Sequence, residues 1–314
     1  MRVYRFLYIF LGLALLLYPG HVHSGEPLPI SEISLQYTPT SIAVNHLDNT
    51  AFAISENYKI LYKVDLATRA VISSYIFQDK PRSVTVEGDR VYVPTGKDSN
   101  GVIHIFDKNL NITKTIALGK SPVSASVGNG YIAVACENMN TVFVISETSL
   151  ATVYTVNIGM KPNHVEIDRK RNEIVVSASM ASSSGTGTTE GGTLFFIDLP
   201  TGNIKRTVNT AQKIKDLKIN TLTDRIILTN AVNGIDVMNP DTLTISNHIE
   251  LPNAGVADVN QSTGMAAVIS PLSLNILTAN NSLEPYSLTK APYDVAINLY
   301  TNQAAIAAEN SIIL

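Results

Sequence analysis

Residues 119–167 read GKSPVSASVGNGYIAVACENMNTVFVISETSLATVYTVNIGMKPNHVEI, and this stretch decides the fold. It opens around Pro122 with a strand that alternates apolar and polar residues, followed by a short turn and a second strand. After a polar turn come two more strands, and the next unit opens at Pro162. One unit of four short strands therefore occupies about 40 residues, a period typical of a β-propeller blade.

The same unit recurs along the chain. The first four units open at Pro39, Pro81, Pro122 and Pro162, which are 42, 41 and 40 residues apart. Two later units have Ile214 and Ala254 where proline is expected, and a seventh opens at residue 291 and stops unfinished. A four-stranded sheet with two apolar faces cannot bury both faces alone, so the sheets must stack radially. Seven such units account for residues 25–314, and we predict a single all-β domain, a seven-bladed β-propeller.

The unfinished seventh unit lacks an outer strand. Residues 30–36, ISEISLQ, precede Thr38 and Pro39 in the way that residues 156–158 precede Lys161 and Pro162. We therefore expect the amino-terminal strand to join the last blade and close the ring, which removes two exposed sheet edges.

Residues 1–24 have the layout of a secretory signal peptide. Arg2 and Arg5 precede an apolar run of 13 residues from Phe6 to Tyr18, and small residues follow it. A helix needs roughly 20 residues to cross a bilayer, so we predict cleavage after Ser24 rather than permanent spanning. The expected location is periplasmic, secreted or at the cell surface. An uncleaved amino-terminal anchor is the alternative.

Composition excludes several classes of protein. With 45% hydrophobic and 16% charged residues, the chain must build a packed core. The 23 basic and 26 acidic residues give a net charge of −3, and loss of two arginines with residues 1–24 leaves 21 − 26 = −5. This balance offers no broad cationic field, so we expect no nucleic-acid partner. The lone Cys136 lies on an alternating strand, where we expect a buried, unreactive thiol.

The chain resembles the YVTN-type β-propeller repeat. Residues 91–107, VYVPTGKDSNGVIHIFD, and residues 193–208, TLFFIDLPTGNIKRTV, carry the resemblance most clearly. It implies an exported, surface or periplasmic seven-bladed propeller. It implies little chemistry, because core and turn residues define the repeat.

Searching for self-contained catalytic motifs finds no nucleophile elbow, zinc-protease helix, phosphate loop or haem-attachment pair in the sequence. The repeat register instead predicts which residues share the opening of the innermost strands, close to the ring axis. The seven positions are Ser41, Ser83, Ser124, His164, Asp216, Val256 and Asp294. All of these except Val256 are candidates for a binding face. A second set follows the second strand of three units, at Glu56, Glu137 and Glu309.

We predict an exported, non-enzymatic propeller that acts as a rigid binding or assembly module for a protein or a cell-envelope component, without a cofactor. The alternative is a hydrolase or lyase that uses His164, Asp216 and Asp294 around a cation at the axial mouth. In that case Ca²⁺ or another cation would take its ligands from Glu56, Glu137, Glu309, Asp216 and Asp294. A partner of an electron-transfer protein is a third and weaker interpretation.

One insertion interrupts the repeat. Residues 179–193, SMASSSGTGTTEGGT, fall between the second and third strands of the fourth unit. Their Ser, Gly and Thr content predicts a flexible loop, which we interpret as a tolerated surface excursion rather than a functional lid.

Overall fold

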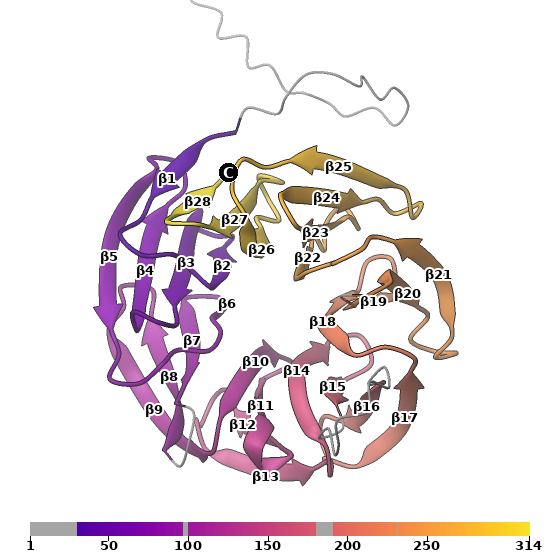
Figure 1. Cartoon of the computed structure of the whole chain (residues 1–314). Helices are drawn as coiled ribbons and strands as arrows, with labels where there is room; N and C mark the ends of the chain where they lie inside the picture. The colour runs from indigo at the N-terminus through magenta and orange to yellow at the C-terminus, as the bar shows by residue number, and fades with distance from the viewer. Residues whose placement is uncertain (1–29, 97–99, 180–190, 231) are drawn as a thin grey trace, which may run out of the picture.

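The computed structural model describes residues 30–96, 100–179, 191–230 and 232–314, which form seven four-stranded antiparallel sheets arranged in a ring (Figure 1). The strands of blades 1 to 3 are β2 (Ser41–Asn45), β3 (Thr50–Ser55), β4 (Ile60–Asp65), β5 (Ala70–Ile76); β6 (Thr85–Glu87), β7 (Arg90–Thr95), β8 (Gly101–Asp107), β9 (Ile112–Gly119); β10 (Pro122–Gly128), β11 (Tyr131–Cys136), β12 (Thr141–Ser146), β13 (Thr152–Asn157). Those of blades 4 and 5 are β14 (Lys161–Asp168), β15 (Glu173–Ser179), β16 (Gly192–Asp198), β17 (Ile204–Thr210); β18 (Ile214–Asn220), β19 (Arg225–Asn230), β20 (Gly234–Met238), β21 (Ile245–Glu250). Those of blades 6 and 7 are β22 (Ala257–Val259), β23 (Ala266–Ser270), β24 (Ser273–Leu277), β25 (Leu283–Ser287); β26 (Pro292–Ile297), β27 (Ala304–Ala308), β28 (Ser311–Ile313), β1 (Glu32–Ser34). The predicted all-β, seven-bladed propeller is confirmed.

The seventh blade joins the two ends of the described chain. Its strand order is β26-β27-β28-β1, and Ile33 in β1 pairs with Ile312 in β28 in antiparallel register. In Figure 1 the indigo strand β1 lies against the yellow strand β28. The predicted closure of the ring by the amino-terminal strand is therefore confirmed.

A β-bulge near the start of the inner strand explains the residues that open each repeat. The pairing register skips one residue in four blades, between Pro122 and Ser124, Pro162 and His164, Ile214 and Asp216, and Pro292 and Asp294. Proline is tolerated at a bulge because the ladder is interrupted there, and the bulge turns the following side chain in a new direction. Ile214 occupies the same register position as the prolines, so the degenerate fifth unit keeps the geometry of the others.

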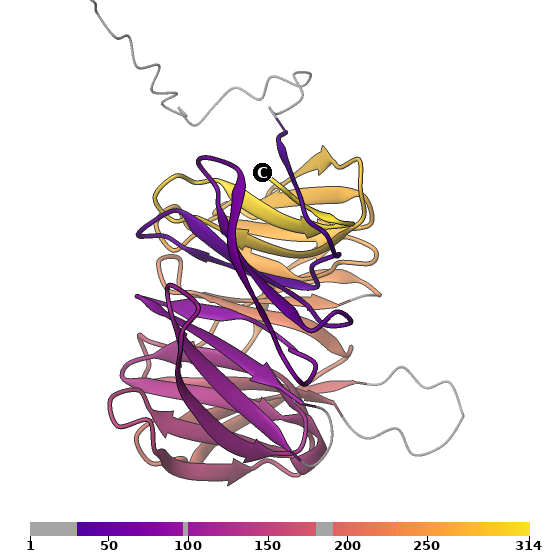
Figure 2. The same ribbon diagram turned by 90° about the vertical axis from the view of Figure 1, so that its left-hand side faces the viewer.

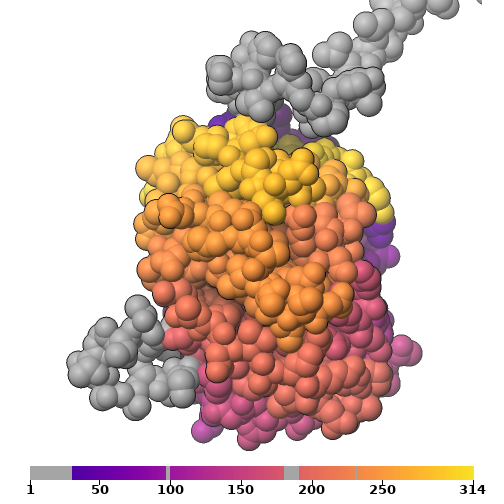
Figure 3. Space-filling model, turned by 90° about the vertical axis from the view of Figure 1, so that its right-hand side faces the viewer, coloured from indigo at the N-terminus to yellow at the C-terminus, as the bar shows by residue number. Residues whose placement is uncertain are grey.

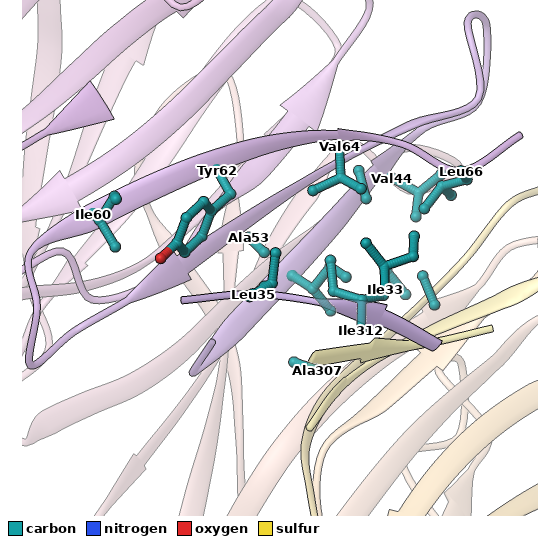
Figure 4. Close-up of a cluster of buried hydrophobic side chains, with 14 residues drawn as sticks. Ile33, Leu35, Val44, Ala53, Ile60, Tyr62, Val64, Leu66, Ala307 and Ile312 are labelled. Carbon is teal, nitrogen blue, oxygen red and sulfur yellow. The ribbon is translucent and has the colours of Figure 1, made fainter. Parts of the chain in front are cut away.

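The hydrophobic core is divided among the seven interfaces between neighbouring blades. Each buried cluster draws its residues from two successive blades. Figure 2 views this ring from its rim, and Figure 3 shows the later blades, in orange and yellow, directly against each other. The interface between blades 7 and 1 is drawn in Figure 4, where Ile33 and Ile312 lie among side chains of blade 1. Closure thus buries apolar surface as well as pairing two strand edges.

Two predictions fall outside the described residues. They are the signal peptide at residues 1–24 and most of the insertion, of which only its ends at Ser179 and residues 191–193 are described. Within the described ranges, the one helical segment is the short 3₁₀ turn η1 (Glu137–Met139). No helix in that part of the chain is long and apolar enough to cross a membrane.

Candidate functional site

A cavity of about 710 Å³ runs along the ring axis. The inner strands of all seven blades line it, from Thr40 and Arg82 at one end to Leu47 and Tyr300 at the other. Leu47 is 68% exposed and Tyr300 is 72% exposed, so this second end of the cavity meets solvent. We call the face at the first end the junction face, because the chain passes there from one blade to the next. The other face, which carries the turns between first and second strands, is the hairpin face.

The residues predicted to share the axial opening do so. Seven side chains at equivalent positions of the inner strands line the cavity: Ser41, Ser83, Ser124, His164, Asp216, Val256 and Asp294. In blades 3, 4, 5 and 7 the bulge described above places these residues immediately after the skipped position. They form the first tier of the cavity.

Two first-tier carboxylates accept hydrogen bonds from the backbone of the next blade. Oδ2 of Asp216 accepts a hydrogen bond from the Ala257 amide at 2.8 Å, and Oδ2 of Asp294 accepts one from the Ile42 amide at 2.9 Å. These amides belong to, or border, the inner strands β22 and β2, whose ladder partners lie on their other side. A buried amide without an acceptor is costly, so these carboxylates stabilise the junctions between blades.

His164 and Asp216 lie in contact, as expected for adjacent blades. Nδ1 of His164 is 3.3 Å from Oδ1 of Asp216. Burial lowers the pKa of His164, and the charge of Asp216 opposes this shift without cancelling it. The imidazole is therefore neutral at pH 7, and its contact with Asp216 is not a strong ion pair.

A second tier of charged residues lies two positions further along the inner strands. Its charged members are Glu166, Lys218 and Asp258, on the successive blades 4, 5 and 6. The equivalent positions on the other blades are small and uncharged: Ala43, Thr85, Ser126 and Ala296. Within this tier the charged residues therefore lie on three successive blades and the neutral ones on the other four. Sequence analysis missed this tier, although the period of two along each strand points to it.

Burial dominates the electrostatics of the cavity. It raises the pKa of Glu166 to about 7 and that of Asp294 to about 7, and it also raises the pKa of Asp258. For Lys218, burial acts to lower the pKa, but the charges of the surrounding carboxylates, Glu166 first among them, outweigh burial and raise it. One ammonium thus stays charged among four carboxylates.

These shifts predict that acidification from pH 8 to pH 6.5 stabilises the fold. Glu166 and Asp294 have pKa values of about 7 in the folded protein, above their ordinary values of 4.5 and 3.8. The folded state therefore binds more protons than the unfolded state in this window, and stability is lost as the pH rises through 7. The expected gain is on the order of 1 kcal/mol, measured by denaturant unfolding at both pH values.

Glu166→Gln should remove about half of this pH dependence, whereas Glu250→Gln, on an outer strand, should leave it unchanged. Equal stability at pH 6.5 and pH 8 would contradict the prediction. Below pH 6.5 His164 and His46 act in the opposite direction, because burial lowers the pKa of each below 6.5 and both must gain charge on unfolding.

The three glutamates of the second predicted set lie on the junction face but do not line the cavity. Glu56 pairs with Arg82 at 2.8 Å, Glu137 begins η1, and Glu309 is exposed at the turn after β27. They are not brought together with Asp216 and Asp294 around the axis. Among the described residues, no group of three or more His, Cys, Asp or Glu side chains is placed to hold a metal ion.

Cys136 is buried in the interface between blades 2 and 3, as predicted. Burial raises the pKa of its thiol to about 12. The thiol therefore stays protonated at neutral pH and acts as a small apolar side chain.

Comparison with known proteins shows the fold alone. No protein-family model matches the chain, so the resemblance to YVTN-type repeats stays a prediction, and no curated protein matches it. Among solved structures, a chain of Kuenenia stuttgartiensis hydrazine synthase is similar with a TM-score of 0.71 and 13% identity, over 94% of this chain and 99% of that one. The WD40 repeats of RRP9 are similar with a TM-score of 0.75 and 9% identity, over 90% and 96% of the two chains. At such low sequence identities, the roles of individual residues cannot be transferred to this chain. The fold itself is widespread, because 1416 chains of solved structures match. The chain is therefore a seven-bladed β-propeller like these two, with no family shown.

Proposed function

We propose that the protein is an exported, non-enzymatic propeller whose junction face binds a partner protein or a cell-envelope component. The proposal rests chiefly on lysines of that face that have no partner within the ring. The sequence layout of residues 1–24 supports export, and the resemblance to YVTN-type repeats agrees with a surface or periplasmic location.

Four lysines lie on the junction face of three successive blades. They are Lys120, Lys161, Lys213 and Lys215, where the chain enters blades 3, 4 and 5. None of these side chains has a hydrogen bond or an ion pair with another described residue. Nearby Lys80 and Arg82, in contrast, both pair with Glu56. Unpaired ammonium groups on one flat face attract an anionic surface.

Two arginines of the hairpin face are paired with acids of that face. Arg169 pairs with Glu87 at 2.6 Å, and Arg171 pairs with Asp224 at 2.6 Å. On blades 3 to 5 of the junction face, outside the cavity, the four lysines outnumber the described acids Glu137 and Glu250 and form a local excess of positive charge. This difference between the faces favours the junction face as the binding surface.

The ring is built to hold such a surface rigid. Side chains link neighbouring inner strands, as Asp216 does to the Ala257 amide, and β1 ties the last blade to the rest of the ring. A rigid surface loses little conformational entropy on binding. We therefore expect the partner to present acidic groups that match the positions of the lysines.

The triple substitution Lys161→Gln, Lys213→Gln and Lys215→Gln should weaken capture of the partner from a cell-envelope extract at least tenfold. Capture by the unaltered protein should decline as salt is added, because exposed charges are screened. The matched control replaces three cations away from this face, with Lys108→Gln, Lys114→Gln and Arg69→Gln, and should capture the partner normally. Equal loss in both variants, or capture that ignores salt, would argue against the proposed face.

A hydrolase or lyase is the second candidate, and the contact between His164 and Asp216 is the observation that favours it. A cation such as Ca²⁺ would have to bind beside Asp216 and Asp294 at the axial mouth. The double substitution His164→Ala and Asp216→Asn separates the two candidates. An enzyme would lose turnover and any Ca²⁺-dependent rise in melting temperature, whereas a binding module would keep its partner.

A further inference from the structure

Two opposite charges in the axial cavity have no direct partner. Glu166 and Lys218 both line the cavity, and within the described residues neither side chain makes a hydrogen bond or an ion pair. Both side chains are half-buried and line the open cavity, and burial raises the pKa of Glu166. Charged groups that line a cavity without a partner among the described residues are available to a ligand or to water.

The charge balance of the cavity selects the sign of that ligand. Glu166, Asp216, Asp258 and Asp294 supply four carboxylates, and Lys218 supplies one ammonium that interacts electrostatically with all four. Fully ionised, this group carries an excess of three negative charges. The two arginines that also line the cavity do not offset it, because Arg82 pairs with Glu56 and Arg169 pairs with Glu87. A cation compensates this excess, whereas an anion would be repelled.

The geometry favours an organic cation over a metal ion. The carboxylates come from different blades, and no three of the described acidic, His or Cys side chains are close enough to hold a metal together. Ca²⁺ requires six to eight oxygen atoms at about 2.3–2.6 Å. An ammonium group needs only single hydrogen bonds of about 2.7–2.9 Å, and each can come from a different carboxylate. The cavity volume of about 710 Å³ also falls in the usual range for small organic ligands.

The spacing of the tiers indicates the length of the ligand. Residues two apart on a strand are about 7 Å apart, so the first-tier Asp294 and the second-tier carboxylates are offset along the axis by roughly this distance. Lys218 already shows an alkylammonium group in this environment. The small side chains Ala43 and Ala296 of the second tier leave room for an aliphatic chain.

We propose that the axial cavity binds a linear aliphatic diamine or polyamine, with one ammonium group at Glu166 and another near Asp294. The ligand enters at the hairpin face, where Leu47 and Tyr300 frame the end of the cavity. This site is distinct from the lysines of the junction face and does not depend on the partner proposed above.

Titration calorimetry with spermidine at low ionic strength and pH 7.5 tests the proposal. The full chain should bind it saturably, and succinate, a short dicarboxylate, should not bind. Glu166→Gln should weaken spermidine binding at least tenfold. The control Glu309→Gln removes an exposed acid outside the cavity and should leave the affinity unchanged. Lys218→Gln should tighten binding several-fold, because it removes the competing ammonium group, and this gain is not expected from a merely structural lysine.

Absence of saturable binding up to millimolar spermidine would overturn the proposal. So would unchanged affinity in Glu166→Gln, or an equal loss in Glu166→Gln and Glu309→Gln, which would indicate nonspecific attraction. Tighter binding of Ca²⁺ than of spermidine, lost in Glu166→Gln, would assign the cavity to a metal instead. The triple lysine variant of the junction face should bind spermidine normally, and Glu166→Gln should still capture the partner, so the two proposals can fail separately.

Discussion

A chain that begins at residue 37 is expected to lose the cooperative unfolding transition of the intact ring. Such a chain lacks β1, so Ile33 and Leu35 leave the cluster between blades 7 and 1, and Ile312 in β28 loses its neighbour. Each of the two isoleucines is at most 3% exposed in the ring. Loss of a buried isoleucine or leucine typically costs about 2–5 kcal/mol, and two are removed together with the pairing of a strand. Thermal unfolding followed by circular dichroism measures the effect.

The matched control begins at residue 30 and keeps β1. It should melt as the full chain does, because the cluster at the seam is intact. As a finer test, Ile33→Ala should lower the free energy of unfolding by about 2–5 kcal/mol, whereas Ile30→Ala, at a position that is 45% exposed, should have little effect. If the chain without β1 melted within a few degrees of the intact one, the seam would not be needed for the ring.

Replacement of Lys218 by methionine is expected to cost about 1–3 kcal/mol of stability at pH 8, because it removes the cation that compensates the surrounding carboxylates. Methionine keeps an unbranched side chain but leaves Glu166, Asp216, Asp258 and Asp294 without a cation among them. The loss should shrink markedly at pH 6. Glu166 and Asp294, whose pKa values of about 7 would rise further without the lysine, are then protonated. Denaturant unfolding at both pH values provides the measurement.

Lys114→Met is the control, because Lys114 lies exposed on the outer strand β9. It should change stability by less than about 0.5 kcal/mol at either pH. A loss in Lys218→Met that was the same at pH 6 and pH 8 would mean that packing, and not charge, explains the role of the lysine.

The architecture could be predicted from the sequence because each blade repeats the same pattern of four strands and their turns. The position of Pro122 and its equivalents fixed the start of each inner strand, and this register correctly placed His164, Asp216 and Asp294 in one cavity. Even the match of Ile33 with Ile312 followed from the unfinished last unit. These features depend on spacing along the chain, which a sequence states directly.

Distance from the axis is harder to obtain from a sequence. The register places Glu56 on the correct face, but this residue follows the second strand of its blade, one strand spacing of about 4.8 Å further from the axis, and it pairs with Arg82 instead. The second tier was accessible to the same reasoning by moving two residues along each strand, which leads from His164 to Glu166 and from Asp216 to Lys218. Only the structure shows that Glu166 and Lys218 have no direct partner among the described residues.

The number of charged residues in the sequence also does not reveal how the charges are distributed between the two faces. A net charge of −3 excludes a broad cationic field, yet it averages over two different faces. On one face Lys161 and Lys213 pair with no described residue, and on the other Arg169 and Arg171 are each paired with an acid. Whether a charge is compensated depends on contacts between blades that are far apart in sequence.

The position of the seam has a mechanical consequence. Residues 1–29 lead directly into β1, so a pull on that end of the chain reaches the ring at the junction of blades 7 and 1. A pull along β1 loads its hydrogen bonds to β28 in shear, so that they share the force rather than breaking one after another. If the protein were tethered by its amino-terminal end, tension would therefore act first on the pairing of β1 with β28. The other blades would stay folded until this pairing broke and the ring opened.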